Sequence, residues 1–135
     1  MLTIKPIVDH FLHGGFKSVE GVLEAPTQAD LPNALPALHV VPATESAEAS
    51  QMAGRRDQRV TFAFSVFVTV GTRLARGAVS DELQKQVQAV KDTVVGWTHP
   101  QASGEVDLLG GRLANVSPAS VTWEVRLSCR YHYRK

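Results

Sequence analysis

The chain has 135 residues, of which 44% are hydrophobic and 20% are charged, as is ordinary for one soluble domain with a single core. Its formal net charge of +1 gives no general attraction to nucleic acid or membranes, and its one cysteine, Cys129, excludes an internal disulfide. The first twelve residues include a Lys, a Pro and an Asp where a signal peptide needs an unbroken apolar run, and no segment approaches the roughly 20 apolar residues of a membrane span. We therefore expect a single domain over residues 1–135 that is made in the cytoplasm and does not enter a membrane.

The first predicted element is a helix close to the start of the chain. Apolar residues recur there at helical spacing, namely Ile4, Ile7, Val8, Phe11 and Leu12. Thr3 is available as the N-cap, and Pro6 fits a first turn because its missing N–H has no partner there. Gly14 and Gly15 are expected to end the helix.

Two short strands and a long loop are expected next. Residues 17–25 predict a strand that Pro26 ends, and residues 35–42, bracketed by prolines, predict an edge or terminal strand. Residues 43–58 are small and polar, with almost nothing to bury, and predict a long flexible loop. Such a loop is the best single candidate for contact with a partner.

The most regular stretch is 59–70, where large apolar residues occupy every second position: Val60, Phe62, Phe64, Val66, Val68 and Val70. Because successive side chains of a strand point to opposite faces, this pattern predicts a strand with one apolar face that a helix or another sheet must cover. The opposite face is small and mildly polar, with Ala63, Ser65, Phe67 and Thr69, so either this face meets water or a second protein surface lies close against it.

A second helix is predicted after a turn at 71–79 that contains Arg73 and Arg76. Ser80 is a good N-cap, and a stripe of apolar residues follows at steps of four and three: Leu83, Val87, Val90, Val94 and Trp97. We expect this helix to cover the apolar strand face, with Trp97 as a core residue that closes the helix onto the sheet.

Two strands complete the prediction, at 106–116, interrupted by Gly110-Gly111, and at 121–133, where apolar and polar residues alternate without a break. The expected fold is α+β, with a single mostly antiparallel, mixed sheet, two helices packed on one face and the order α-β-β-β-α-β-β. From Arg112 onward five Lys or Arg oppose one acid, and the even spacing of Arg126, Arg130 and Arg134 predicts an exposed basic side of the last strand.

No recognisable catalytic pattern is present in the sequence. His10 and His13, three residues apart on the first helix, are spaced as a metal pair but lack a third and a fourth ligand. Cys129 falls on the apolar face of the last strand, where a thiol behaves as a small hydrophobe. We therefore assign no catalytic, cofactor-binding or metal-binding residues, while a small intracellular metal-dependent enzyme stays as a minor alternative.

The order of these elements, together with a second helix that ends in Val94-Val95-Gly96-Trp97 followed by Pro100, resembles the tail terminator family of tailed bacteriophages, including lambda-type and Mu-like tail-completion proteins. The resemblance implies a hexameric ring at the head-proximal end of the tail tube, which stops tube polymerisation and provides the surface that joins the tail to the neck. It also implies assembly in the host cytoplasm and a final place in the virion tail, in the neck region.

The partners implied by this resemblance are other copies of the chain, the tail tube protein, a neck or head-completion protein, the sheath end if the tail is contractile, and DNA in transit through the lumen. The candidate contact residues come from this sequence alone, and they are Arg55, Arg56, Arg59, Arg73, Arg76, Arg126 and Arg130. A head-tail joining protein or a tail-tube protein is the alternative within the virion.

Overall fold

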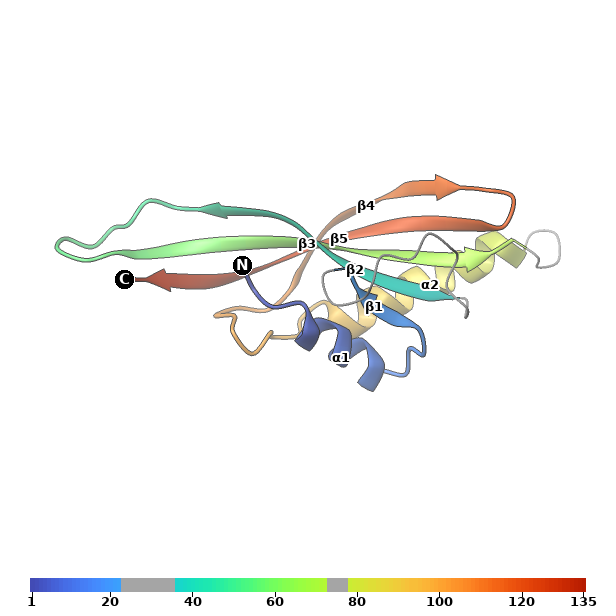
Figure 1. Ribbon diagram of the computed structural model, residues 1–135, viewed down its shortest axis with the longest axis horizontal. Coiled ribbons are helices and arrows are strands. Elements are labelled where there is room, and N and C mark those ends of the chain that lie inside the picture. Colours follow the sequence, from blue (N-terminus) through green and yellow to red (C-terminus); the bar gives the residue numbers. More distant parts are fainter. Residues whose placement is uncertain (23–35, 73–77) are drawn as a thin grey trace.

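The computed structural model describes residues 1–22, 36–72 and 78–135, which form one five-stranded mixed sheet with two helices on the same face (Figure 1). The elements are α1 (Lys5–His13), β1 (Val19–Gly21), β2 (Ala37–Ala47), β3 (Asp57–Gly71), α2 (Ala78–Val94), β4 (Asp107–Val116) and β5 (Ser120–Arg134). The strand order across the sheet is β1-β2-β3-β5-β4, and all neighbouring pairs are antiparallel except β1 with β2. The predicted α+β class and element order are confirmed.

The centre of the sheet is β3, whose predicted apolar face is buried along its whole length. Its six alternating residues are between 0% and 4% exposed, and they are Val60, Phe62, Phe64, Val66, Val68 and Val70. The cover comes from α1 and from Val87, Val90 and Val94 of α2, as the helical stripe predicted. This layer of helices on one face leaves the opposite face of the sheet, here called the outer face, without a helix over it among the described elements (Figure 1).

The start of α1 differs from the prediction. Ile4 occupies the N-cap position and Thr3 does not cap the helix. Instead, the backbone N–H and the Oγ1 hydroxyl of Thr3 both donate to Oε1 of Gln101, at 3.3 and 3.1 Å. A partner distant in the sequence has therefore replaced the local capping bond. At the other end, Gly14 N donates to His10 O at 3.0 Å, and Gly15 takes a φ of +100°, as a glycine that ends a helix can.

Strand β2 is longer than predicted, because it continues through Pro42 to Ala47. Strand β1 pairs only with Leu38, His39 and Val40, so beyond Val40 one side of β2 is an open edge of the described sheet. A proline is tolerated on such an edge because it removes no ladder hydrogen bond on that side. The register also shifts between Pro42 and Thr44.

The loop predicted at 43–58 is accordingly shorter. Residues 43–47 belong to β2 and residues 57–58 to β3, so the connection itself spans 48–56. Thr44 and Ser46 pair with β3 although both are exposed and polar. Because neither face of this part of β2 is buried, it lacks the alternation of apolar and polar residues from which a strand is predicted. The flexibility predicted for this loop and the assignment of the whole chain to a single domain stay predictions.

Helix α2 includes Ala78 and Val79, so Ser80 lies within the helix and is not its N-cap. Alanine is the best helix former, and its presence extends the helix past the serine that marked the predicted start. Arg73 and Arg76 lie outside the described residues, as do residues 23–35. No helix among the residues described is long and apolar enough to cross a membrane.

Candidate interaction surfaces

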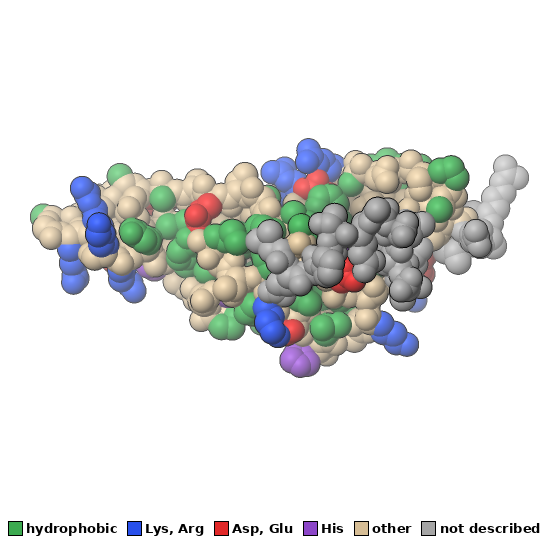
Figure 2. Space-filling model, viewed as in Figure 1, with side chains coloured by type: hydrophobic (Ala, Val, Ile, Leu, Met, Phe, Trp, Pro, Cys, Tyr) green, Lys and Arg blue, Asp and Glu red, His purple; other side chains and the backbone are tan. Residues whose placement is uncertain are grey.

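The β2–β3 hairpin and the end of β5 project beyond the helices as a three-stranded arm (Figure 1). We define the arm as residues 45–59 and 130–135. Figure 2 shows Lys and Arg side chains gathered at its far end. Its cationic side chains are Arg55, Arg56, Arg59, Arg130, Arg134 and Lys135, against the three acids Glu45, Glu48 and Asp57. The arm is therefore a basic projection from a protein whose total charge is close to neutral.

The tip of the arm is held by short-range hydrogen bonds. The Ser50 Oγ accepts from Asp57 N at 3.2 Å, and Gln58 Nε2 donates to the Glu48 carbonyl at 3.0 Å. Gly54 has a φ of +81°, a conformation that favours glycine in a turn. These bonds shape the turn but leave the side chains of Arg55 and Arg56 exposed.

Two groups of side chains brace the arm, one next to the tip and one at its base. Asp57 lies 3.0 Å from His132 Nδ1 and 3.3 Å from Arg134 Nε, and the hydrogen bond from His132 is the main reason that the pKa of Asp57 is lowered. On the helix side, Tyr131 donates to Glu45 and thereby ties β5 to β2 across β3. Burial, together with this bond, raises the pKa of Tyr131 to about 12, and the same bond lowers the pKa of Glu45.

The strand register brings three of the predicted arginines onto the outer face. Arg126 lies opposite Ser65, Arg130 lies opposite Thr61, and Arg59 lies opposite His132, one pair further along. All three arginines are exposed, which the even spacing on β5 predicted for Arg126 and Arg130. Arg134, opposite Asp57 and also exposed, continues this row, and it lies eight residues along β5 from Arg126, so the row extends over roughly 27 Å of strand.

The tip arginines form a separate group. Arg55 and Arg56 sit in the connection between β2 and β3, and the carbonyl of Arg56 accepts from Lys135 N at 3.1 Å. They are thus beside the chain's C-terminal residues, at the far end of the arm from Arg126. The structure divides the predicted set into a tip and an outer-face row, with Arg59 at the junction.

A polar network at the centre of the outer face was missed by sequence reasoning. Glu124 of β5 is only 6% exposed, although no described helix covers it. It accepts from Ser65 Oγ on β3 at 2.6 Å and from Arg112 Nε on β4 at 2.6 Å. The hydrogen bond from Ser65, followed by the pairing with Arg112, lowers the pKa of Glu124 despite its burial.

The network crosses three strands and so fixes their mutual position. The only signal in the sequence was that Glu124 is the single acid among the cations of the last strand, and the register that selects its partners is not readable from spacing. Around it, Ser65 and Thr69 are buried while Ala63 and Phe67 are half-buried. The two alternatives for this face, contact with water or with a second protein surface, both stay predictions.

Strand β4 forms one edge of the sheet and carries an apolar surface that the sequence did not single out. Its four exposed large hydrophobic residues are Leu108, Leu109, Leu113 and Val116, with exposed fractions between 42% and 62%. Leu108 and Leu113 lie opposite Leu127 and Trp123, and Val116 lies opposite Val121, which places the three on the helix side of the sheet. Helix α2 packs chiefly on β3 and β5 and leaves this side of β4 uncovered.

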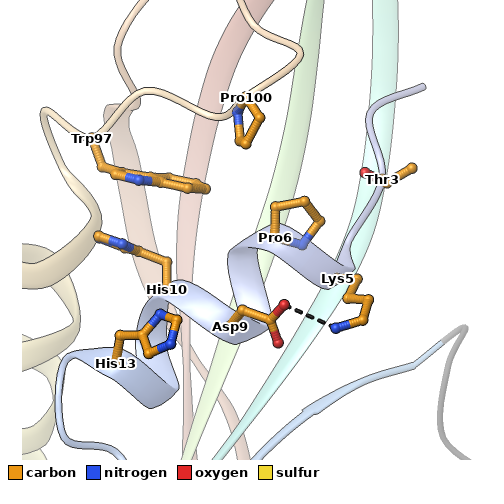
Figure 3. A pocket seen from close by; sticks show the side chains of 8 residues that line it. All are labelled: Thr3, Lys5, Pro6, Asp9, His10, His13, Trp97 and Pro100. Carbon is orange, nitrogen blue, oxygen red and sulfur yellow. Dashed lines mark hydrogen bonds and ion pairs between the residues drawn. The ribbon is translucent and has the colours of Figure 1, made fainter.

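An open depression lies between α1 and the segment that follows α2 (Figure 3). In Figure 3 the His10 ring lies against Trp97, with ring centroids 4.3 Å apart, while the Lys5–Asp9 ion pair borders the other side. The Nε2–H of His10 donates to the Thr93 carbonyl at 2.8 Å. The described residues include no group of three or more His, Cys, Asp or Glu placed to hold a metal ion.

Trp97 differs from its predicted role. It is partly buried and packs at the border of the core, after the end of α2 at Val94, so it joins α1 to the following segment instead of closing α2 onto the sheet. The neighbouring His99 is fully buried, with Nε2 donating to the Thr3 carbonyl at 2.8 Å and Nδ1 accepting from Gln101 N at 3.0 Å. The side chains of Trp97 and His99, at the Gly-Trp turn, are therefore engaged in contacts that hold the fold together.

Cys129 is buried among core residues of β3 and β5, as its strand position predicted. Desolvation raises the pKa of its thiol to about 11. A thiol of this kind is poorly suited to act as a nucleophile near neutral pH.

Comparison with known proteins adds one match. The sequence model of the family described as phage tail terminator protein matches residues 1–135, the whole chain. No curated protein sequence matches it.

Proposed function

Because this chain belongs to the phage tail terminator family, we propose that it forms a hexameric ring on the head-proximal end of the tail tube, stops tube growth there and presents the surface that receives the neck. The family is structural, so the chain is a structural protein of a phage tail and not an enzyme. The observation that carries the proposal is the match to this family over all 135 residues, which includes the arm and both edges of the sheet.

The shape of the subunit supports assembly into a ring. A closed ring needs two different surfaces on each subunit, because a head-to-tail contact joins one surface to the other around the symmetry axis. The described sheet has an open edge at β4 and another at β2 beyond Val40. The arm adds a projection long enough to extend past its own subunit's helices (Figure 1).

The proposed partners follow from the same role. The ring contacts further copies of itself, the last ring of tail tube protein, a neck or head-completion protein, and the end of the sheath where the tail is contractile. Assembly takes place in the host cytoplasm and the product resides in the virion tail. The basic tip, with Arg55 and Arg56 exposed, supports contact with acidic groups because guanidinium forks pair well with carboxylates.

Addition of the purified protein to polymerising tail tube subunits tests this function. Electron microscopy is expected to show shorter tubes with a ring at one end, and light scattering of the protein alone or with tube ends is expected to give a mass of six subunits. The matched control is the Val95→Glu variant, which alters an exposed residue beyond α2 and is expected to cap tubes as the parent does.

Two other outcomes would contradict the proposal in different ways. Incorporation of the protein along the tube wall, with continued growth, would make the chain a tail-tube protein. A strict monomer that leaves tube length unchanged even when tube ends are supplied would remove the ring itself.

A further inference from the structure

The free edge of β4 has the properties of a buried surface. Its exposed leucines and valine, Leu108, Leu109, Leu113 and Val116, together expose on the order of 400 Å² of mostly apolar side chain, three of them on the helix side of the sheet and Leu109 in the bulge between Leu108 and Gly110. Exposed edge strands are usually protected by charges, prolines or short length. β4 is ten residues long, contains no proline and has only two charged residues, Asp107 and Arg112.

The opposite edge of the described sheet offers a matching segment. β1 covers β2 only as far as Val40, and Pro42 with the register shift after it interrupts the edge, which leaves Thr44–Ala47 as regular open strand. All four of these residues are exposed, and three of them, Thr44, Ser46 and Ala47, are small. Small side chains allow another backbone to approach closely.

The two edges also have compatible directions. β5 is antiparallel to both β3 and β4, and β2 is antiparallel to β3, so β2 and β4 run in opposite directions. In a ring, rotation about the central axis places a second copy beside β4 with its strands running in the same directions as in the first copy. The β2 of the second copy then pairs antiparallel with β4, which is the commoner and slightly more stable arrangement.

From these observations we propose that neighbouring copies of this chain join head to tail through β4 of one copy and Thr44–Ala47 of β2 of the next, so that their sheets become continuous. The inference rests on the proposed ring and names the contact that closes it. When β4 of one copy joins β2 of the next, the pair still has one free β2 edge at one end and one free β4 edge at the other. Further copies therefore add through the same contact until the ring closes.

The areas fit this assignment. A stable interface buries about 800 Å² on each partner, of which the apolar surface of β4 supplies about half. The remainder comes from the backbone of the paired strands and from the neighbour's arm, which begins at Glu45 within this segment of β2. A contact of β4 with β4 would bury the same apolar surface but would end at a dimer.

The test uses one variant for each edge. Leu109→Glu with Val116→Glu places acids in the apolar surface of the β4 edge, where the neighbour's Glu48 also repels them, and Thr44→Glu with Ser46→Glu blocks the β2 edge. The matched control is Leu12→Glu with Val95→Glu, two exposed apolar residues away from both edges. Circular dichroism confirms that each variant is folded, and the single substitutions replace any pair that is not.

Each edge variant alone is expected to remain a monomer at concentrations at which the parent and the control form the ring, an association weaker by roughly 100-fold or more because central apolar contacts dominate interfaces. An equal mixture of the two edge variants is expected to give a dimer with one copy of each and nothing larger. Each copy then has one intact edge, and the two intact edges are complementary.

The outcomes separate this inference from the proposed function. In one outcome the parent and both edge variants form the ring and cap tubes at the same protein concentration. The proposed pairing of β4 with β2 is then wrong, and the proposed function stands. A mixture in which only the β2-edge variant dimerises with itself would show a β4 to β4 contact and overturn the head-to-tail assignment. A parent that neither assembles nor caps tubes would overturn both.

Discussion

Trp97 offers a quantitative test of how the structure holds α1. Its indole packs against the core border and stacks on the His10 ring at 4.3 Å with an angle of 14° between the planes. A partly buried Trp covers on the order of 150 Å², which contributes roughly 3 to 4 kcal/mol at about 25 cal/mol per Å². The stack adds about 0.5 to 1.5 kcal/mol. We therefore expect Trp97→Ala to lower the free energy of unfolding by about 4 kcal/mol, within the usual range for truncation of a large aromatic residue.

A double-mutant cycle separates the stack from general packing. His10→Ala, Trp97→Ala and the double variant are unfolded in urea and followed by circular dichroism, with Leu12→Ala on the exposed side of α1 as the control. The expected coupling between His10 and Trp97 is about 1 kcal/mol. A Trp97→Ala variant within about 1 kcal/mol of the parent would refute the packing role, and a coupling near zero would refute the stack alone.

Three further predictions concern the outer face and the tip. Glu124→Gln is expected to destabilise the fold by about 1 to 3 kcal/mol in urea, because a buried acceptor loses its charge-assisted hydrogen bonds. Because the pKa of Glu124 is lowered in the folded state, its carboxylate stabilises the fold at a pH above the ordinary carboxyl pKa, and this stabilisation is lost as the pH falls through the folded-state pKa. Melting temperatures that do not change as the pH is lowered would argue against this contribution. Replacing Arg55 and Arg56 together with Ala is expected to leave the melting temperature nearly unchanged yet slow ring closure or tube capping, and assembly at the parent's rate would exclude that role for the tip. If the outer-face row lines the lumen, DNA retention at low ionic strength is expected to be weak and salt-sensitive and to fall in the Arg126→Ala, Arg130→Ala variant, whereas complete absence of retention in the parent leaves these arginines as subunit contacts only.

The regular apolar patterns were sufficient to predict the elements of the core. The alternation from Val60 to Val70 and the stripe from Val87 to Val94 follow from strand and helix geometry, and the structure buries both. Local signals were less reliable at element ends. Thr3 and Ser80 were plausible caps, but a bond to Gln101 and the helix-forming Ala78 prevailed.

What the sequence determined by itself was therefore the set of elements, their order and the apolar faces, since these depend on periodicity within one segment. Register and edge position were decided only in the tertiary structure, because they depend on which strands become neighbours. The contact of Glu124 with Ser65 and Arg112 joins residues 59 and 12 positions apart, and no spacing rule selects those partners. The exposed leucines of β4 likewise resemble core residues in the sequence, and they form a surface because β4 is the last strand of the sheet and α2 does not extend over it.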